Sequence, residues 1–183
     1  MITDFIGNTP LIKLNYFSEI SGCNIYGKAE FMNPGGSIKD RAAKYIIEHA
    51  IENNLLRSGG TIVEGTAGNT GIGLALVGNA YNLNTIIVIP DSQAEEKKFT
   101  LRACGAELIE VPAVPYKDKN NYVKYSKKIA ENQKNENGVL WANQFDNEVN
   151  FIGHQNDTGP EILRQLNNKI DGFVCSCGTG GTL

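Results

Sequence analysis

The feature that most restricts the fold is the run Thr85-Ile-Ile-Val-Ile-Pro90. β-Branched residues fill it without a charged interruption, which is typical of a strand buried on both faces. Such a strand needs a layer on each side, and helices supply those layers in parallel sheets. The run therefore indicates an α/β chain.

Strand-like and helical segments alternate on both sides of this run. We expect further strands at 11–14, 24–31, 61–64, 107–111, 139–142 and 173–175, and helices at 39–53, 72–81, 94–104, 122–135 and 158–167. The polar segment 143–157 is expected to be irregular. The alternation predicts an open, mostly parallel, twisted sheet with helices on both faces. Ligands of such sheets bind at the carboxyl ends of the strands.

Composition excludes several classes of protein. The chain has 183 residues and a formal net charge of -3, which gives no reason to expect nucleic acid or an anionic membrane as partner. No apolar run is long enough to span a bilayer, and the first residues lack the regions of a signal peptide. Four cysteines (Cys23, Cys104, Cys175 and Cys177) are unevenly spaced, so we expect reduced thiols in a cytoplasmic protein. Cys175 and Cys177 are expected on a buried strand rather than at a metal, because no second Cys/His pair completes a site.

A lysine follows a Pro-Gly-Gly turn in the stretch Asn33-Pro-Gly-Gly-Ser-Ile-Lys39-Asp-Arg41. Ser37 can cap the helix that begins there, with Asp40 three residues later as in a capping box. Lys39 then lies in the first turn, where the helix dipole disfavours a cation. Desolvation and positive neighbours would lower its pKa and favour the neutral amine, which makes it a candidate for chemistry. The alternative is an ordinary solvated lysine.

Two glycine-rich loops follow predicted strands. The loop Gly178-Thr-Gly-Gly-Thr182 can aim several backbone N–H groups at one phosphate, although it can also be a simple tight turn. The loop 65–71 presents Thr66, Asn69 and Thr70 at the start of a helix, where free N–H groups suit a small carboxylate. A structural helix entry is the alternative for this second loop. It lacks the order of a dinucleotide-binding motif.

Gln144, the Thr158–Glu161 stretch and the two histidines are the remaining features of interest. Gln144 follows a predicted strand and can present its amide to the same crevice. Thr158-Gly-Pro-Glu161 predicts a capping box with Pro in the first turn of a helix. His49 is expected on a helix and His154 in a loop, neither of them as a ligand or base.

A lysine, a phosphate nest and a carboxylate loop belong together if the cofactor is an aldehyde that carries a phosphate, which describes pyridoxal phosphate. The chain resembles the cysteine synthase (O-acetylserine sulfhydrylase) family, fold-type II enzymes of the tryptophan-synthase-β superfamily. The resemblance rests on Gly7-Asn-Thr-Pro10, Asn33 to Arg41, Thr66 to Gly71, Thr158 to Glu161 and Gly178 to Thr182, in that order along the whole chain.

The resemblance implies a role for each site residue. Lys39 would carry the cofactor as a Schiff base and act as catalytic base, and Asn69 would bond the ring hydroxyl. The phosphate would be held by Gly178, Thr179, Gly180, Gly181 and Thr182, and the substrate carboxylate by Thr66, Ala67, Asn69, Thr70 and Gln144. Ala67 departs from the family pattern, in which a serine is usual.

The resemblance also implies architecture and reaction. We expect a two-domain enzyme with 36–145 as one α/β domain and with 1–35 and 146–183 as part of a second, whose remainder would follow Leu183. The implied reaction is β-replacement, which makes L-cysteine from O-acetyl-L-serine and sulfide in a homodimer. The open alternatives are cysteine desulfhydrase, cystathionine β-synthase-like or serine/threonine deaminase activity, and a catalytically silent fragment. A dinucleotide-binding protein is the least favoured alternative, because the binding motif is absent.

Overall fold

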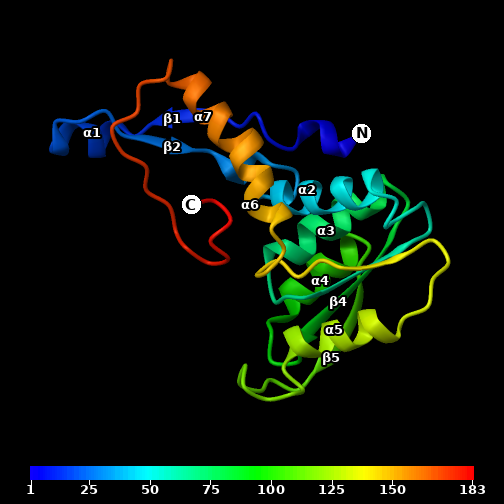
Figure 1. Cartoon of the computed structure of the whole chain (residues 1–183). Helices are drawn as coiled ribbons and strands as arrows, with labels where there is room; N and C mark the ends of the chain where they lie inside the picture. Colours follow the sequence, from blue (N-terminus) through cyan, green and yellow to red (C-terminus); the bar gives the residue numbers. More distant parts are fainter.

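The computed structural model describes residues 1–183 and is built on a four-stranded parallel sheet (Figure 1). The strand order is β5-β4-β3-β6, and the strands are β3 (Thr61–Gly65), β4 (Asn84–Pro90), β5 (Glu107–Val111) and β6 (Val139–Trp141). A separate antiparallel pair joins β1 (Leu11–Lys13) to β2 (Tyr26–Lys28). The predicted α/β class and parallel sheet are confirmed.

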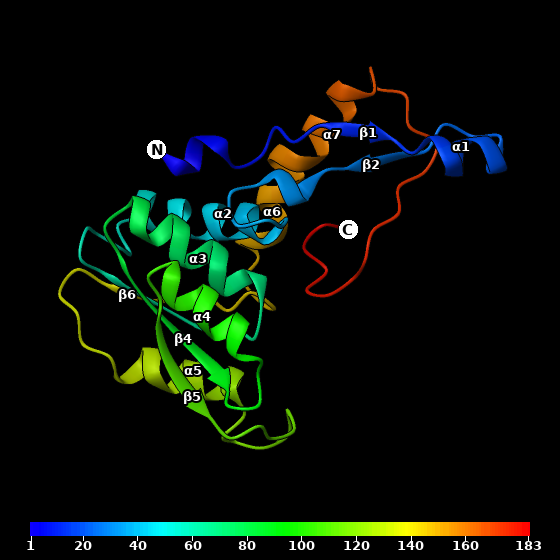
Figure 2. The same cartoon turned by 180° about the vertical axis from the view of Figure 1, so that it is seen from behind.

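Helices cover both faces of the parallel sheet (Figures 1 and 2). They are α2 (Lys39–Glu52), α3 (Asn69–Ala80), α4 (Glu95–Ala103) and α5 (Tyr122–Asn132). A Cβ placed on Gly78 of α3 would meet Thr85 and Ile62, whereas one placed on Gly65 would meet the backbone of α5. Because Ile62 and Gly65 point to opposite faces of β3, α3 and α5 lie on opposite sides of the sheet.

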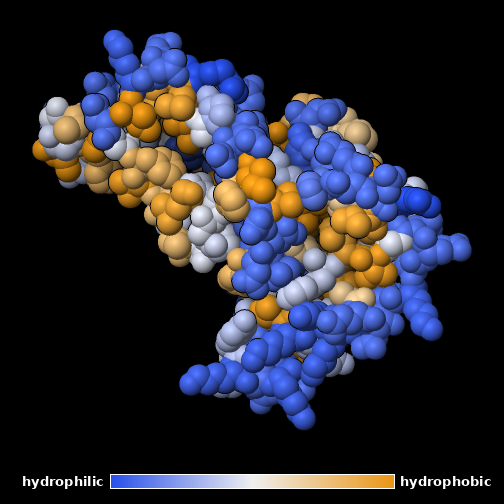
Figure 3. Space-filling view, in the orientation of Figure 1, coloured by the Kyte–Doolittle hydropathy of each residue, from blue (hydrophilic) through white to orange (hydrophobic).

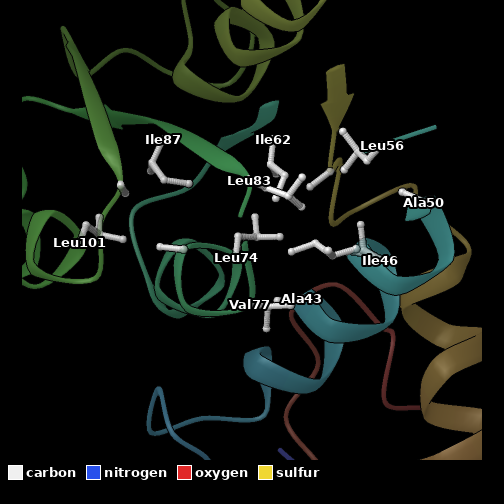
Figure 4. Packing of buried hydrophobic residues seen from close by; sticks show 14 of the residues in the cluster. Ala43, Ile46, Ala50, Leu56, Ile62, Leu74, Val77, Leu83, Ile87 and Leu101 are labelled. Atoms are coloured by element: carbon white, nitrogen blue, oxygen red, sulfur yellow. The ribbon is translucent and has the colours of Figure 1, made fainter. Parts of the chain in front are cut away.

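The apolar core lies between the sheet, α2 and α3 (Figure 4). Ile62, Leu74 and Ile87 are fully buried there, at 0% exposure each. Complete burial of such a side chain stabilises the fold by about 1.5–3 kcal/mol. On the other face, Trp141 Nε1 donates to Ser126 Oγ of α5 at 3.1 Å.

The β1–β2 pair, α1 (Asn15–Ser21) and the C-terminal helices form the other part of the molecule. Two short 3₁₀ turns, Ile2–Phe5 and Glu30–Met32, accompany them. The segments α6 (Val149–Gly153), the π-helical stretch His154–Thr158 and α7 (Gly159–Gln165) follow one another without a break. The expectation of irregular structure at 143–157 is therefore wrong for its second half.

The predicted capping box at Thr158 is also wrong. Thr158 has helical backbone angles (φ -62°, ψ -45°) because the helix arrives from residue 149, so it makes no side-chain capping bond. The Glu161 carboxylate instead accepts hydrogen bonds from Arg41 and Lys28. Local sequence identified a helix here, but it placed the start too late.

The strand expected at 173–175 does not form. These residues pair with no other strand, Val174 is 96% exposed and Cys177 is exposed as well, so the expected buried setting of the cysteines is wrong. A strand needs a neighbour to satisfy its backbone groups, and none lies beside this segment. Several large apolar side chains of this part of the molecule are exposed, including Phe17, Ile20, Phe173 and Val174. Figure 3 shows hydrophobic surface over both parts of the molecule. Helices long and apolar enough to cross a membrane are absent.

Candidate active site

Lys39 is the first residue of α2. The Ser37 hydroxyl accepts the Lys39 N–H at 3.1 Å, while the Asp40 carboxylate turns back to accept the N–H of Gly35 at 2.5 Å. Ser37 therefore accepts the first N–H of α2, but the N-cap position is Ile38 rather than the expected Ser37, and Asp40 does not complete the expected box. The Lys39 side chain is half-buried and makes no hydrogen bond or ion pair, and this burial lowers the pKa of its ammonium below the usual value.

Two glycines fix where this lysine sits. A Cβ on Gly73 of α3 would lie 3.0 Å from the Lys39 carbonyl oxygen and 3.1 Å from Ala43 Cβ, so the two helices touch at the first turn of α2. A Cβ on Gly35 would collide with the Asp40 carboxylate. Burial raises the pKa of Asp40 to about 6. The start of α2 is therefore held one helical turn from Asn69, at the start of α3.

Arg41, two residues after Lys39, is completely buried at 0% side-chain exposure. Its guanidinium donates to Glu30 at 2.9 Å and to Glu161 at 2.8 Å. It also reaches Thr9 at 3.2 Å, and Lys28 pairs with the same Glu161. We call these five residues, Arg41, Glu30, Glu161, Lys28 and Thr9, the Arg41 hub.

The Arg41 hub explains three of the sequence motifs. Burial alone would raise the pKa of Glu161, but hydrogen bonds from Arg41 and Lys28 lower it to about 2. The same balance, with Arg41 and Thr9 as donors, lowers the pKa of Glu30. The motifs at 7–10, 33–41 and 158–161 thus meet at one ion-pair network. Sequence reasoning missed it, because Arg41 lies opposite the apolar positions Ala43, Ile46 and Ala50 on the predicted helix and carries no local signal of burial.

The loop after β3 leads into α3, and Thr70 in the first turn of α3 contacts Gln144, which follows β6. Thr70 is buried and donates its hydroxyl to Gln144 Oε1 at 2.6 Å, whereas Thr66 Oγ1 accepts the Gly68 N–H at 3.3 Å. Asn69 is exposed, and the half-buried Ala67 packs against the core. The structure therefore brings Thr70 and Gln144 together, as the expectation of a common crevice requires.

Glu64, the residue before this loop, is a site neighbour that sequence reasoning missed. It is 1% exposed and lies on the α3 face of β3 with Ile62, and its register partner on β4 is Ile87. Burial raises its pKa to about 7, although hydrogen bonds from Asn143 and Gln144 oppose the shift. Its Oε2 has no partner.

The loop 178–182 forms a turn with free donors. Gly180 has a φ of +80°, and Gly181 is buried while Gly178 is exposed. The N–H groups of Gly180 and Thr182 have no partner in the chain. A cavity of about 260 Å³ lies between this loop and the segment after β6, lined in part by Gln144 and Thr179.

Asn150 of α6 connects this loop to Gln144. Its Nδ2 donates to the Gln144 carbonyl oxygen at 3.0 Å and to Thr179 Oγ1 at 3.1 Å. A continuous path of hydrogen bonds therefore runs from Thr70 through Gln144 and Asn150 to Thr179. Asn150 carries no periodic signal in the sequence, because it lies in the segment expected to be irregular.

His154 differs from its expected loop setting. It is buried in the π-helical stretch, and its Nδ1 lies 2.8 Å from Thr158 Oγ1. Burial and the positive charges of Arg41 and Lys39 lower its pKa to about 4, so the ring is neutral at pH 7. Its ring lines a second cavity of about 580 Å³ together with Thr182.

These residues fit pyridoxal phosphate. Lys39 supplies an amine with a lowered pKa, and the loop 178–182 supplies free N–H groups beside a glycine in the left-handed region. Groups of three or more His, Cys, Asp or Glu side chains that could hold a metal are absent. A parallel α/β sheet with such an amine and such a loop at its ligand-binding end defines a cofactor-dependent enzyme of the pyridoxal phosphate class.

Comparison with known proteins agrees with that class. The model of the family "Pyridoxal-phosphate dependent enzyme" matches residues 2–183, and the chain belongs to this family. It is 52% identical to "Cysteine synthase 1" of Neurospora crassa over 181 residues, which are 99% of this chain and 47% of that protein. The chain spans about half the length of the curated relatives it matches.

Two solved structures share the fold. A hydrogen sulfide-producing enzyme from Fusobacterium nucleatum has a TM-score of 0.84 and 38% identity, over 100% of this chain and 59% of that one. O-ureido-L-serine synthase has a TM-score of 0.87 and 36% identity, over 99% of this chain and 55% of that one. The fold-type II likeness expected from the motifs is confirmed.

Proposed function

We propose that the whole protein makes L-cysteine from O-acetyl-L-serine and sulfide by β-replacement. The observation that carries the proposal is the Thr70–Gln144 hydrogen bond at 2.6 Å, at the free N-terminal end of α3. The similarity to cysteine synthase 1 along 99% of this chain supports the choice of reaction. We further propose the domain division at 36–145, a homodimer and a cytoplasmic location.

Lys39 would hold the cofactor and move the substrate's α-proton. When bound, pyridoxal phosphate supplies an electron-withdrawing ring that makes this proton removable. Removal requires the neutral amine, and the burial that lowers the Lys39 pKa increases its share at neutral pH. Asn69, one helical turn before Gly73, would orient the ring.

Thr70 and Gln144 would bind the substrate carboxylate. The Thr70 hydroxyl donates to Gln144 Oε1, and the Gln144 side chain donates to Glu64, so this pair is held in place beside the start of α3. The backbone N–H groups of Asn69 and Thr70, free at the start of α3, face no competing acceptor in the chain. Thr66 and Ala67, in the same loop, would also surround the substrate carboxylate. At the far side, Gly178, Thr179, Gly180, Gly181 and Thr182 would hold the phosphate.

The test is cofactor absorbance together with product formation. In Lys39→Ala, we expect the visible band of the purified protein to be lost and cysteine formation from O-acetyl-L-serine and sulfide to fall by at least a thousandfold. The matched control is Lys97→Ala, since Lys97 is an exposed lysine in the first turn of α4. Lack of a visible band in the unaltered protein would overturn the proposal in favour of a silent protein.

Release of sulfide from L-cysteine is the second candidate, because one structural neighbour is a hydrogen sulfide-producing enzyme. Both reactions need the same cofactor and the same carboxylate loop, so the fold does not separate them. Measuring cysteine made from O-acetyl-L-serine against sulfide released from cysteine, with one protein preparation, decides between them. A protein that releases sulfide but makes no cysteine would contradict the first proposal.

A further inference from the structure

Asn150 is a buried polar residue that the proposed reaction does not use. It is 3% exposed, and its single Nδ2 group serves two acceptors from segments far apart in the sequence. One acceptor is the Gln144 carbonyl oxygen at 3.0 Å, and the other is Thr179 Oγ1 at 3.1 Å. Gln144 in turn accepts the Thr70 hydroxyl. One amide therefore connects the 178–182 loop (the phosphate loop) to Gln144, which in turn contacts the 65–71 loop (the carboxylate loop).

The other atom of the same amide has no partner. Asn150 Oδ1 is buried and makes no hydrogen bond, which is costly unless a nearby donor completes it. The phosphate loop is packed tightly against it, since a Cβ on Gly181 would lie 2.5 Å from Oδ1. Movement of this loop therefore changes the surroundings of Asn150 directly.

We propose that Asn150 is a positioning residue that couples cofactor phosphate binding to substrate carboxylate binding. The proposal rests on the function proposed above. Phosphate held by the loop fixes Thr179, Thr179 fixes the Asn150 amide, and the amide fixes the Gln144 backbone. Gln144 then keeps its Oε1 on Thr70, beside the free N–H groups at the start of α3 that would bind the carboxylate. The two ligands are thus linked through one side chain.

The coupling has a matched control on the same segment. Asn147 Nδ2 also donates to a backbone carbonyl, that of Ala142 at 3.0 Å, and its Oδ1 accepts the Val149 N–H at 3.1 Å. Asn147 therefore stabilises its own turn but makes no hydrogen bond to Gln144 or to the 178–182 loop. An effect confined to Asn150 separates coupling from loss of a local turn.

The experiment titrates cofactor-free protein with pyridoxal phosphate and with pyridoxal, for Asn150→Ala and Asn147→Ala. We expect Asn150→Ala to weaken pyridoxal phosphate binding about tenfold, which is the effect of losing about one hydrogen bond. Pyridoxal, which lacks the phosphate, should bind both variants like the unaltered protein. In the loaded protein, binding of L-alanine should weaken severalfold in Asn150→Ala, whereas that of L-alaninamide, which has no carboxylate, should not change.

Other outcomes overturn the inference. If Asn150→Ala weakens phosphate binding but leaves L-alanine binding unchanged, or if Asn147→Ala has the same effects, the amide does not couple the ligands. Should Asn150→Ala fail to fold, Thr179→Val breaks the same path from the loop and must weaken L-alanine binding. If the unaltered protein binds no pyridoxal phosphate, the proposed function itself fails, which is a different result.

Discussion

The α/β unit and the Arg41 hub are stabilised in opposite ways. Between the sheet, α2 and α3, stability comes from apolar side chains such as Ile62 and Leu74, whose burial has no preferred direction. At the hub, it comes from a buried arginine with ionised partners at 2.8–2.9 Å. The first region tolerates changes of similar volume, whereas the second depends on the geometry of every donor.

The same chemical group behaves differently in the two regions. Glu64 has no cation beside it, and burial raises its pKa to about 7. Glu161 is held by Arg41 and Lys28, which lower its pKa to about 2 in spite of burial. The partner thus decides the ionisation of a buried carboxyl more than burial itself does. Lys39 lies between these regions, since α2 packs on α3 and carries Arg41.

The largest effect should follow removal of the hub cation. Arg41→Met leaves the Glu30 and Glu161 carboxylates without their main partner, and we expect the free energy of unfolding in urea to fall by about 3–5 kcal/mol. Arg102→Met is the control, because Arg102 pairs with Glu110 while 50% exposed, and it should lose less than about 1 kcal/mol. Equal small losses in the two variants would show that the Arg41 hub does not stabilise the fold.

A cavity in the apolar core should cost somewhat less. Leu74 is 0% exposed, and Leu74→Ala should lower the free energy of unfolding by about 3 kcal/mol, since both transfer and cavity terms are lost. Leu55→Ala, at a side chain that is 55% exposed, should change it by less than about 0.5 kcal/mol. Leu74→Met should lose much less stability than Leu74→Ala, because it keeps most of the side-chain volume. Arg41→Met also keeps much of the volume, but it should still lose stability because the carboxylates need the guanidinium donors.

The smallest effect concerns pH. The raised pKa of Glu64 means that the folded protein binds a proton which the unfolded chain has released, so stability falls as pH rises from about 4.5 to about 7. Glu64→Gln should flatten this part of the profile, because it removes the carboxyl that titrates there. Glu107→Gln, at an exposed glutamate, is the control. Below pH 4.5 the sign reverses, because the lowered pKa of Glu161 makes the hub lose stability as pH falls toward 2.

Elements with a strong local pattern were predictable from the sequence. The β-branched run at 85–90 forms a strand buried on both faces, and Lys39 begins a helix after its glycine turn. Helix α6 was not predicted, because its five residues are too few to show a helical period and it packs on α2, where Gly153 meets Tyr45 from far away in the sequence. The strand at 173–175 failed for the converse reason, since its local pattern has no neighbouring strand to pair with.

The candidate site shows the same division. Thr70 and Gln144 were expected in one crevice because both follow parallel strands, and they do make contact. Asn150 and Glu64 became visible only with the fold, since an asparagine in a polar segment and a glutamate in a strand carry no distinctive spacing. The Arg41 hub likewise depends on contacts between residues more than a hundred positions apart, such as Arg41 and Glu161.

Trp141 gives this molecule a built-in optical reporter. It is the one tryptophan of the chain, and its indole is fixed by Ser126 with the Lys127 ammonium 5.5 Å from its ring centroid. Its emission therefore reports on the sheet and α5 alone, whereas circular dichroism at amide wavelengths averages helices of both regions. Superimposable unfolding curves by the two methods would mean that the hub and the core melt as one cooperative unit. Curves with different midpoints would show whether the helices of the Arg41 hub unfold before or after the sheet.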